Sequence, residues 1–562
     1  MPLRDAAEIL ESAGADQWVM RRSDFSGGVG VWRRREGARS LRALTGYWFG
    51  RNDSFIPGQL TPPLLSTVDT PTSISNSKTD YAAMTEWVDS SGAAFVYLVK
   101  GTQLWRTQTT AFGAVVKLLS GAQGRQLVRV PTDSSGSIPH LVWVCGAGAG
   151  TQITTSGTSW SNLWPTGTAD QRALDLGFWV QINMGDFSDW RFAGRMTQTP
   201  RINEFILGNV GGNGPTSAGT GIVMPNAGTT APAFIGHISP QKAYVTNGPW
   251  IVEFFAPGTG GNLGMIPYYG PFSDNLGGCE HGDEFAVFSR DEIALWATTR
   301  PPRYIGPWRD GCPPDISGSF KSIISYNGYL IAYWEMDSAS PVPTAGQGNT
   351  IIFWGRSNEA GEWTLHPRSA KKSDGTDTDL IGGFPLSCGQ AMVMAEGSVS
   401  GGGKRRLWVP TADGTAGRLY WQEHPLPGWN PLFDTTMQYE DGPLYTYDAH
   451  QDLIMMGHDA AGLMEVERNA YFPEATSGIT VDYRMNYDSA ATEEAGGADW
   501  RTLLTLDERR RTVKVASTAG QQGLAVQLRV GIDRVTATQP PVLRDLGILA
   551  ERQARSPALE RT

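Results

Sequence analysis

Short apolar runs alternate with turn sequences over most of the chain. Between about Tyr81 and Glu474, runs of four to seven residues such as AFVYLV, HLVWV, EFAVF and YLIAYW are separated by turns such as KGT, SGT, NGY and DAAG. Strands of this length, bounded by residues that favour turns, are typical of all-β proteins. The pattern therefore predicts an all-β domain.

The number of strands limits how they can be arranged. A single sheet cannot keep growing, because its twist accumulates, so two architectures remain: several sandwiches in series, or a β-propeller. The apolar runs favour the propeller, since an inner strand covered on both faces by neighbouring blades is apolar throughout. Outer strands should alternate, as QLWRTQ and GRLYWQE do. At about 40–50 residues per blade, we predict six to eight blades.

Two further features belong to this predicted propeller. A tryptophan follows a Gly-containing turn in GTSW (157–160), GEW (361–363) and GRLYW (417–421). We expect such rings to lie over a neighbouring sheet and to bury a large area. In the segment 200–235, the stretch NVGGNGPTSAGTGIVMPNAGTTAP has few large apolar residues, which predicts a long loop on one face.

Composition shifts divide the chain into four parts. Residues 1–80 are predicted to be an N-terminal arm and linker, with a short helix at Arg4–Ser12 and a connection rich in Pro, Ser and Thr from Gly58. Residues 81–476 form the predicted propeller, and residues 551–562 a polar tail.

Residues 477–550 are predicted to form a small C-terminal β-sandwich. VDYRMNYDSAATEEAGGADWRTLLTL suggests a strand, a loop and a second strand. In LAVQLRVGID, alternate residues from Leu524 to Val530 are apolar and share one face, with Gln527 and Arg529 on the other. PPVLRDLGILAERQ closes the unit. About 75 residues are enough for such a sandwich when it docks on a neighbouring domain.

The bulk numbers exclude several classes of protein. Of 562 residues, 40 % are hydrophobic and 18 % charged, with 68 Gly and 20 Trp, which fits neither a disordered chain nor a helical bundle. The net charge of −10 argues against a nucleic-acid-binding surface. The N-terminus lacks the features of a secretory signal, and no apolar run approaches about 18 residues. We therefore expect folding in a cytoplasm and no membrane span.

The four cysteines suggest two kinds of chemistry, disulfide bonds and zinc binding. Cys145, Cys279, Cys312 and Cys388 are too few and too scattered for a disulfide scaffold. Cys279, His281 and Cys312 offer three zinc ligands, but the spacing matches no compact zinc module and no fourth ligand is near. Buried free thiols are the favoured interpretation.

An acidic turn and two histidines are the other candidate functional residues. Asp374, Asp377 and Asp379 lie in one turn and offer hard oxygen ligands for Ca²⁺, but the spacing and the distal Glu of an EF-hand are missing. A solvated acidic loop is favoured. His450 and His458 flank the predicted strand DLIMM and are interpreted as turn residues. No metal or cofactor is predicted.

Glycoside hydrolysis is the enzyme activity to test, because propellers also host sialidases and other glycosidases. Such enzymes carry the turn motif Ser-x-Asp-x-Gly-x-x-Trp. In the stretch from Ser357 to Trp363, Glu359 replaces the Asp and one residue is missing, and Thr155 takes the Asp position in ITTSGTSW. No Ser-His-Asp order, phosphate-binding Gly-rich loop or HExxH motif occurs. We predict no catalytic residue and no enzyme activity.

Three basic clusters remain, at residues 32–36, 401–408 and 507–514. They offer phosphate contacts to DNA, or ion pairs with acidic patches on neighbouring subunits. In an acidic chain the subunit contact is favoured, and DNA contact is expected to be incidental at most.

Parts of the chain resemble bacteriophage tail proteins that are built on β-propellers. The C-terminal unit, with Tyr483, Trp500, LAVQLRV and the ending PPVLRDLGI, resembles the closing sandwich of those proteins. Residues 250–299 are similar to a middle section of the same proteins, and SDFSGGVG (23–30) is similar to the opening strand of tail components in long-tailed phages.

The resemblance implies a virion structural protein: a minor tail or tail-tip component, or the nozzle of a short tail. The implied partners are other tail proteins, further copies of the chain and a host-surface receptor. Two alternatives stay open. One is a host-surface adhesin that contacts glycan through the loop 200–235, Tyr268 and Tyr269. The other is a propeller glycosidase, whose cleavage would depend on a single carboxylate such as Glu284.

Overall fold

The computed structural model describes the strands of the chain and many of their turns. Every regular element in these residues is a β-strand, and no helix that could cross a membrane occurs among them. The described residues are 17–22, 28–29, 46–47, 49–50, 66–68, 81–107, 114–118, 126–130, 139–145, 152–162, 173–180, 190–196, 201–206, 216–217, 222–223, 235–239, 242–255, 264–275, 277–305, 318–336, 350–357, 363–368, 393–395, 405–412, 417–424, 445–448, 461–471, 478–485, 501–506, 512–514, 522–523, 526–533 and 542–552.

Seven antiparallel sheets occupy the described residues between 66 and 424, and we number them in chain order. Sheet one contains β6 (Tyr81–Val88), β7 (Ala94–Lys100), β8 (Gln103–Thr107) and β9 (Ala114–Leu118). Sheet two contains β10 (Gln126–Val130), β11 (His140–Val144), β12 (Gln152–Thr154) and β13 (Ser161–Asn162). Sheet three contains β14 (Ala173–Val180), β15 (Trp190–Met196), β16 (Arg201–Ile206), β17 (Thr216–Ser217) and β18 (Ile222–Val223).

The remaining four sheets follow the same plan. Sheet four contains β19 (Ile235–Ser239), β20 (Lys242–Asn247), β21 (Trp250–Phe255) and β22 (Gly264–Tyr269). Sheet five contains β23 (Gly277–His281), β24 (Glu284–Phe288), β25 (Ile293–Ala297) and β26 (Arg300–Ile305). Sheet six contains β27 (Gly318–Tyr326), β28 (Tyr329–Met336), β29 (Thr350–Ser357) and β30 (Trp363–Arg368). Sheet seven contains β31 (Val393–Ala395), β32 (Arg405–Ala412), β33 (Gly417–His424) and, as its last strand, β5 (Ser66–Val68).

Two more sheets combine the C-terminal region with N-terminal strands. The first contains β1 (Gln17–Arg22), β41 (Val542–Arg552), β35 (Ala461–Tyr471), β38 (Thr512–Lys514) and β39 (Gln522–Gly523). The second contains β37 (Arg501–Leu506), β36 (Gly478–Met485), β40 (Val526–Asp533), β34 (Tyr445–Asp448) and β4 (Phe49–Gly50). A short parallel pair joins β2 (Gly28–Val29) to β3 (Gly46–Tyr47).

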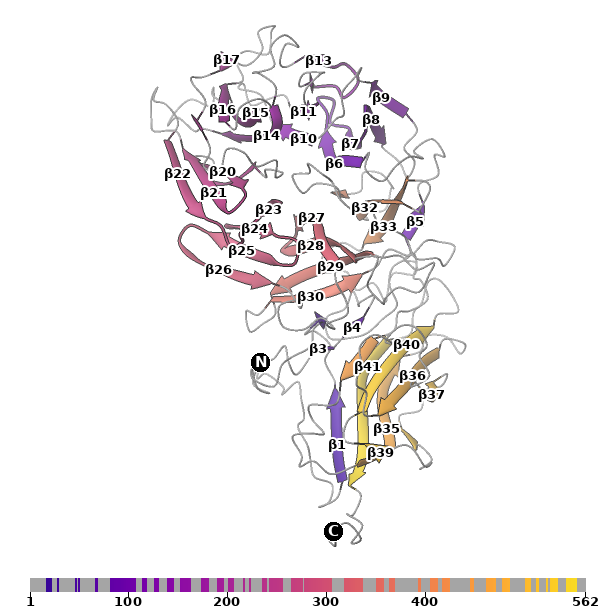
Figure 1. Cartoon of the computed structure of the whole chain (residues 1–562). Helices are drawn as coiled ribbons and strands as arrows, with labels where there is room; N and C mark the ends of the chain where they lie inside the picture. Colours follow the sequence, from indigo (N-terminus) through magenta and orange to yellow (C-terminus); the bar gives the residue numbers. More distant parts are fainter. Residues whose placement is uncertain are drawn as a thin grey trace.

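The numbered sheets are arranged around a common centre, as Figure 1 shows in its upper part. The first strands of neighbouring sheets contact one another from β6 through β10, β14, β19 and β23 to β27, and β31 of the last sheet contacts β6 of the first. Both C-terminal sheets lie together below this arrangement, with β1 beside β41 (Figure 1). The prediction of an all-β, propeller-like protein is confirmed.

In sheets one, two, five and six the apolar runs lie on the second strand, not on the innermost one as the sequence suggested, and in sheet five the third strand β25 is also buried throughout. β7, β11, β24 and β28 carry these runs, and β11 and β24 are buried at every residue. A second strand has hydrogen-bonded neighbours at both edges and another sheet over each face, so no side chain reaches water. The outermost strand β26, by contrast, is mostly exposed.

Apolar clusters between sheets hold the arrangement together. One cluster joins sheets one, six and seven, and its buried members include Leu98, Tyr333, Trp354 and Trp408. A second joins sheets one and two, and a third joins sheets four and five. Because each sheet is covered only by its neighbours, removing one sheet would expose the apolar faces of two others.

The tryptophans after Gly-containing turns behave in two ways. Trp363 packs edge-on against His281 of sheet five, with ring centroids 5.3 Å apart, so it lies over the neighbouring sheet as predicted. Trp160 and Trp421 instead contact Trp143 and Trp408 of their own sheets, at 6.1 and 6.4 Å. Both rings also pack against clusters that include residues of neighbouring sheets.

Gly157, in the turn before Trp160, is needed both for its backbone angle and for the space it leaves. Its φ is 71°, and a Cβ there would overlap the hydroxyl oxygen of buried Tyr97 from sheet one. We expect Gly157→Ala to lower the free energy of unfolding by about 3 kcal/mol, from left-handed strain and displacement of Tyr97. Urea unfolding measures this loss.

Gly92 provides the matched control for Gly157. Its φ is 83°, but a Cβ there would have no atom within 4 Å. Gly92→Ala should therefore cost only the backbone strain of about 1–2 kcal/mol. Equal losses for the two variants would show that the contact with Tyr97 has no energetic weight.

The sheet pairings do not follow the expected division at residues 80 and 476. β5, in the predicted arm 1–80, completes sheet seven, while β34 and β35, in the range 81–476, pair with β40 and β41. The prediction of one long loop at 200–235 is wrong in part, because β16 lies there and pairs with both β17 and β18. The pairings of β5, β34 and β35 join distant segments, and no local pattern encodes them. The predicted hairpin of β36 and β37 is present.

Candidate functional site

A fixed connection joins sheet four to sheet five at residues 270–275. The Gly270 amide donates to the carbonyl of Pro249 at 2.8 Å, and the Asn275 amide donates to the carbonyl of Gly248 at 3.0 Å. The Asn275 side chain is fully buried, and its Nδ2 donates to the carbonyls of Gly248 and Phe272. Both ends of the connection are therefore tied to the β20–β21 turn.

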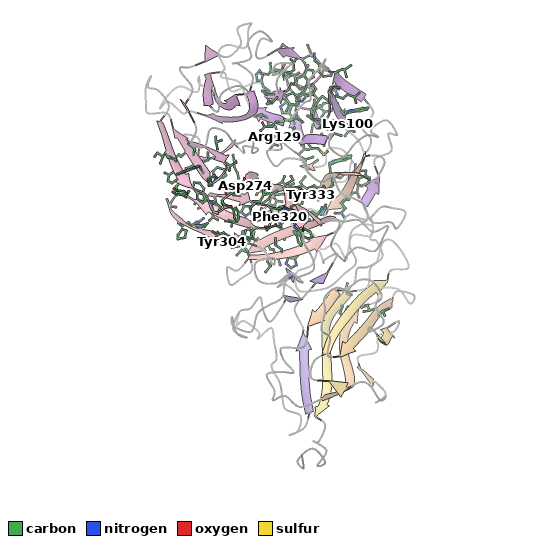
Figure 2. All side chains as sticks on the ribbon, viewed as in Figure 1. Lys100, Arg129, Asp274, Tyr304, Phe320 and Tyr333 are labelled. Carbon is green, nitrogen blue, oxygen red and sulfur yellow. The ribbon has the colours of Figure 1, made fainter. Side chains whose placement is uncertain are left out.

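Two aromatic pairs flank this connection, and we call their four residues the aromatic rim. Trp250 and Tyr269 stack with ring centroids 4.3 Å apart and an interplanar angle of 28°. Phe272 meets Tyr304 edge-on at 5.8 Å, and the Tyr304 hydroxyl donates to the carbonyl of Pro271 at 3.1 Å. Tyr269 is 76 % exposed and Tyr304 41 %. Figure 2 labels Tyr304 at the junction of the two sheets.

A buried carboxylate lies on the face of sheet four that meets sheet five. Glu253 is 2 % exposed and accepts hydrogen bonds at its Oε2 from the Tyr244 hydroxyl at 3.1 Å and the Tyr268 hydroxyl at 3.2 Å. Tyr268 also packs edge-on against Trp296 at 5.8 Å. Since Tyr268 and Tyr269 are consecutive in β22, their side chains point to opposite faces. Of this predicted pair, only Tyr269 belongs to the rim.

The tyrosines beside Glu253 are hydrogen-bond donors and not ionised nucleophiles. Burial raises the pKa of Tyr244 and of Tyr268, and the negative charge of Glu253 raises both further. A tyrosine nucleophile needs the opposite shift. This cluster therefore fixes the sheet junction and does not activate a phenol.

Glu284, the carboxylate on which the glycosidase alternative depended, is held by two arginines. Its side chain is 4 % exposed; Oε1 forms an ion pair with Arg300 Nε at 2.8 Å, and Oε2 accepts a hydrogen bond from Arg303 Nη2. Arg300 also pairs with exposed Asp283 at 3.2 Å. Because a guanidinium group occupies each carboxylate oxygen, Glu284 stabilises the end of sheet five.

This arrangement predicts a stability effect for Glu284→Gln. We expect the free energy of unfolding to fall by about 1–2 kcal/mol, because two ion pairs are lost while both arginines keep access to water. The control Asp283→Asn removes an exposed partner of the same Arg300 and should cost less than about 0.5 kcal/mol. Chemical denaturation of both variants tests this, and a silent Glu284→Gln would contradict it.

The proposed zinc ligands are not prepared for a metal. His281 Nδ1 lies 2.8 Å from Ser325 Oγ. Burial lowers the pKa of His281; the negative charge of Glu284 raises it, and the positive charge of Arg303 lowers it. Burial raises the pKa of the Cys279 thiol, which disfavours the thiolate that zinc needs. Cys312 lies outside the described residues. Within the described parts of the chain, no group of three metal-ligating side chains occurs.

Several other sequence candidates fall outside the described residues. They are Cys388, the aspartates at 374, 377 and 379, His450, His458 and the basic cluster 32–36. Of the cluster 507–514, the structure describes β38 without its side chains.

The described arginines of the cluster 401–408 make contacts with other side chains of the same chain. Arg406 is 4 % exposed, pairs with Glu423 at 2.8 Å and lies 4.1 Å from the Trp421 ring centroid. Arg405 lies 4.8 Å from the ring centroid of Tyr326 in sheet six. Aromatic rings and a carboxylate of the same chain therefore hold these two residues, and the expected subunit contact of the cluster stays a prediction.

Sequence reasoning missed Trp250 and Glu253 as parts of this junction. The signal was present in WIVEFF (250–255), where one acid interrupts an otherwise apolar strand. Side chains alternate between the two faces of this strand, so Trp250 lies on one face and Ile251 and Glu253 lie on the other.

The chain matches no protein-family model and no curated protein sequence. Among solved structures, it is similar to the exo-β-1,3-galactanase of Phanerochaete chrysosporium, with 10 % identity over 87 % of this chain and 100 % of that chain, at a TM-score of 0.29. It is also similar to BBS1N in complex with ARL6DN (11 % identity, 62 % and 94 % covered, TM-score 0.39) and to the N-terminal domain of Nup159 (9 % identity, 61 % and 76 % covered, TM-score 0.24). At these TM-scores the similarities carry no argument about function.

Proposed function

We propose that the chain is a structural component of a bacteriophage tail, assembled through subunit contacts. In this proposal the seven sheets of residues 66–424 are the blades of a closed β-propeller, and the two C-terminal sheets form a β-sandwich. The resemblance of the segments 23–30, 250–299 and 477–550 to tail proteins supports the assignment. The expected location is the virion tail, after assembly in the host cytoplasm.

The observation that carries the proposal is the use of the N-terminal strands as a strap. β5 pairs with β33, β4 with β34, and β1 with β41, so three successive segments fasten three different sheets. The last strand of the chain thus shares a sheet with the first. Such a strap makes the propeller and the C-terminal sheets one mechanical unit, which suits a part of a particle that must transmit force.

The buried carboxylates support a structural role over glycoside hydrolysis. Among the described residues, the buried acids are Glu253, held by two phenols, and Glu284, held by two guanidinium groups. Hydrolysis of a glycosidic bond needs two carboxyl groups that face the substrate. Each of these two acids is instead bound by side chains of its own sheet.

Subunit contacts are expected to use side chains and loops rather than strand edges. The outermost strand β26 carries Pro301 and Pro302, which lack the amide that edge pairing requires. A ring with edges blocked in this way joins further copies without extending its sheets. We propose a symmetric homo-oligomer, since closed symmetry is the common form of such assemblies.

Immuno-electron microscopy tests the proposed role. An antibody raised against the purified chain is applied to virions produced from the genome that encodes it, and label is expected on the tail. A capsid antibody is the control for the head, and pre-immune serum is the control for background. Label confined to the soluble fraction of the lysate, with bare virions, would reject the proposal.

A further inference from the structure

We propose that the aromatic rim is a binding site for the pyranose rings of an uncharged polysaccharide. This proposal does not depend on the tail assignment, because it rests only on the junction of sheets four and five. The rim consists of Trp250, Tyr269, Phe272 and Tyr304, and the exposed residues Ser273 and Asp274 follow Phe272 in the same connection.

The exposed rings have the geometry that sugars use. Trp250 covers one face of the Tyr269 ring, and the residue as a whole is 76 % exposed, so the other face is open to solvent. An open aromatic face attached to a rigid strand packs against the C–H face of a pyranose. Tyrosine and tryptophan provide this contact at a low cost in side-chain entropy, since each has two rotatable side-chain bonds.

The connection that carries the polar groups is fixed before any ligand arrives. Asn275 ties it to Gly248 through both its backbone amide and its side chain, and the Tyr304 hydroxyl holds the carbonyl of Pro271. Little conformational entropy is lost when a ligand binds to such a segment, so weak contacts are sufficient. Asp274, which Figure 2 labels at this junction, is placed to accept hydrogen bonds from sugar hydroxyl groups.

The small size and the charge of the rim favour an uncharged polysaccharide over a protein partner or an acidic polymer. A stable protein interface buries about 800 Å² and 20–30 residues on each partner, with a contiguous apolar centre. The rim instead presents two separate pairs of rings, and the adjoining connection contributes an exposed hydroxyl and an exposed carboxyl group. The Asp274 charge and the chain's net charge of −10 repel acidic polymers, so uncharged sugars remain.

Affinity electrophoresis of the full chain tests the site. Native gels contain dextran, barley β-glucan, galactomannan or glycol chitin as uncharged or weakly charged probes, and alginate as the acidic probe. We expect at least one uncharged probe to retard the chain, and alginate not to. Tyr269→Ala and Trp250→Ala should each weaken retardation about tenfold through loss of a stacking surface.

Tyr268→Phe is the matched control, because it changes the neighbouring tyrosine on the opposite face of β22 and should leave retardation unchanged. Circular dichroism checks the folding of each variant, and Tyr304→Ala gives a second, independent change at the rim. Retardation by no uncharged probe, retardation that survives Tyr269→Ala and Tyr304→Ala, or stronger retardation by alginate overturns the proposal. Native mass spectrometry in which Tyr269→Ala changes the oligomeric state also overturns it, since the rim would then be a contact between copies.

Discussion

Replacing Thr67 and Val68 together with proline is expected to open the ring of sheets and to lower the free energy of unfolding by about 3–5 kcal/mol. These residues form most of β5, which pairs with Tyr420, Trp421 and Gln422 of β33. Alternate amides of a strand point to the same edge, so one of two consecutive prolines always removes a donor from this pairing. β5 has three residues and no spare length to compensate.

The prolines already present in β26 show why the context matters. β26 contains Pro301 and Pro302 and is also the last strand of its sheet, but its pairing with β25 shifts register between Leu295 and Ala297. Such an irregularity accommodates residues without amides. β5 pairs with β33 in unbroken register, so it has no comparable place for a proline.

Urea unfolding and limited proteolysis measure the effect of the proline variant. We expect an earlier unfolding transition and new cleavage between the N-terminal segment and sheet seven. Thr67→Val with Val68→Ile is the matched control, because it changes the same two side chains and keeps both amides. Unchanged stability in the proline variant would mean that β5 does not close the ring.

Local periodicity was sufficient to predict the strands but not their places in the sheets. Runs such as HLVWV and EFAVF were predicted to be buried strands, and β11 and β24 are buried throughout. Their position one strand away from the centre depends on which strand meets the neighbouring sheets. That is a property of how the sheets are arranged around the centre, which no window of ten residues contains.

The pairings that tie the chain together are non-local, and sequence patterns carry little information about them. The segment around β5 was interpreted as an extended connection because it is rich in Pro, Ser and Thr. Its three paired residues acquire their role only when β33, about 350 residues later, presents an unpaired edge. The C-terminal partners of β34 and β35 were missed for the same reason.

Part of the candidate site was predictable from strand alternation. Tyr268 and Tyr269 were both proposed as glycan contacts, yet consecutive strand residues face opposite ways, and Tyr268 lies against Glu253. The stacking of Trp250 on Tyr269 needed the β21–β22 register, which places the two residues directly opposite each other. Register depends on the intervening segment and was not accessible from the sequence.

Trp408→Ala is expected to lower the free energy of unfolding by about 3–5 kcal/mol, the usual range for deleting a fully buried large aromatic side chain. Trp408 is 0 % exposed and belongs to the cluster that joins sheets one, six and seven. The cavity would lie where the last sheet meets the first. Equilibrium unfolding measures the loss, and Trp250→Ala, at a half-exposed ring, should cost far less.

Combining Trp408→Ala with the proline change in β5 distinguishes a closed ring from a row of independent sheets. Trp408 pairs with Trp421 across sheet seven, and Trp421 pairs with Thr67, so the two sites are connected through one residue. If closure is cooperative, the second change costs less once the first has opened the ring, and the combined loss is smaller than the sum by about 1 kcal/mol or more. Strict additivity would mean that the junction of sheets one and seven stands without β5.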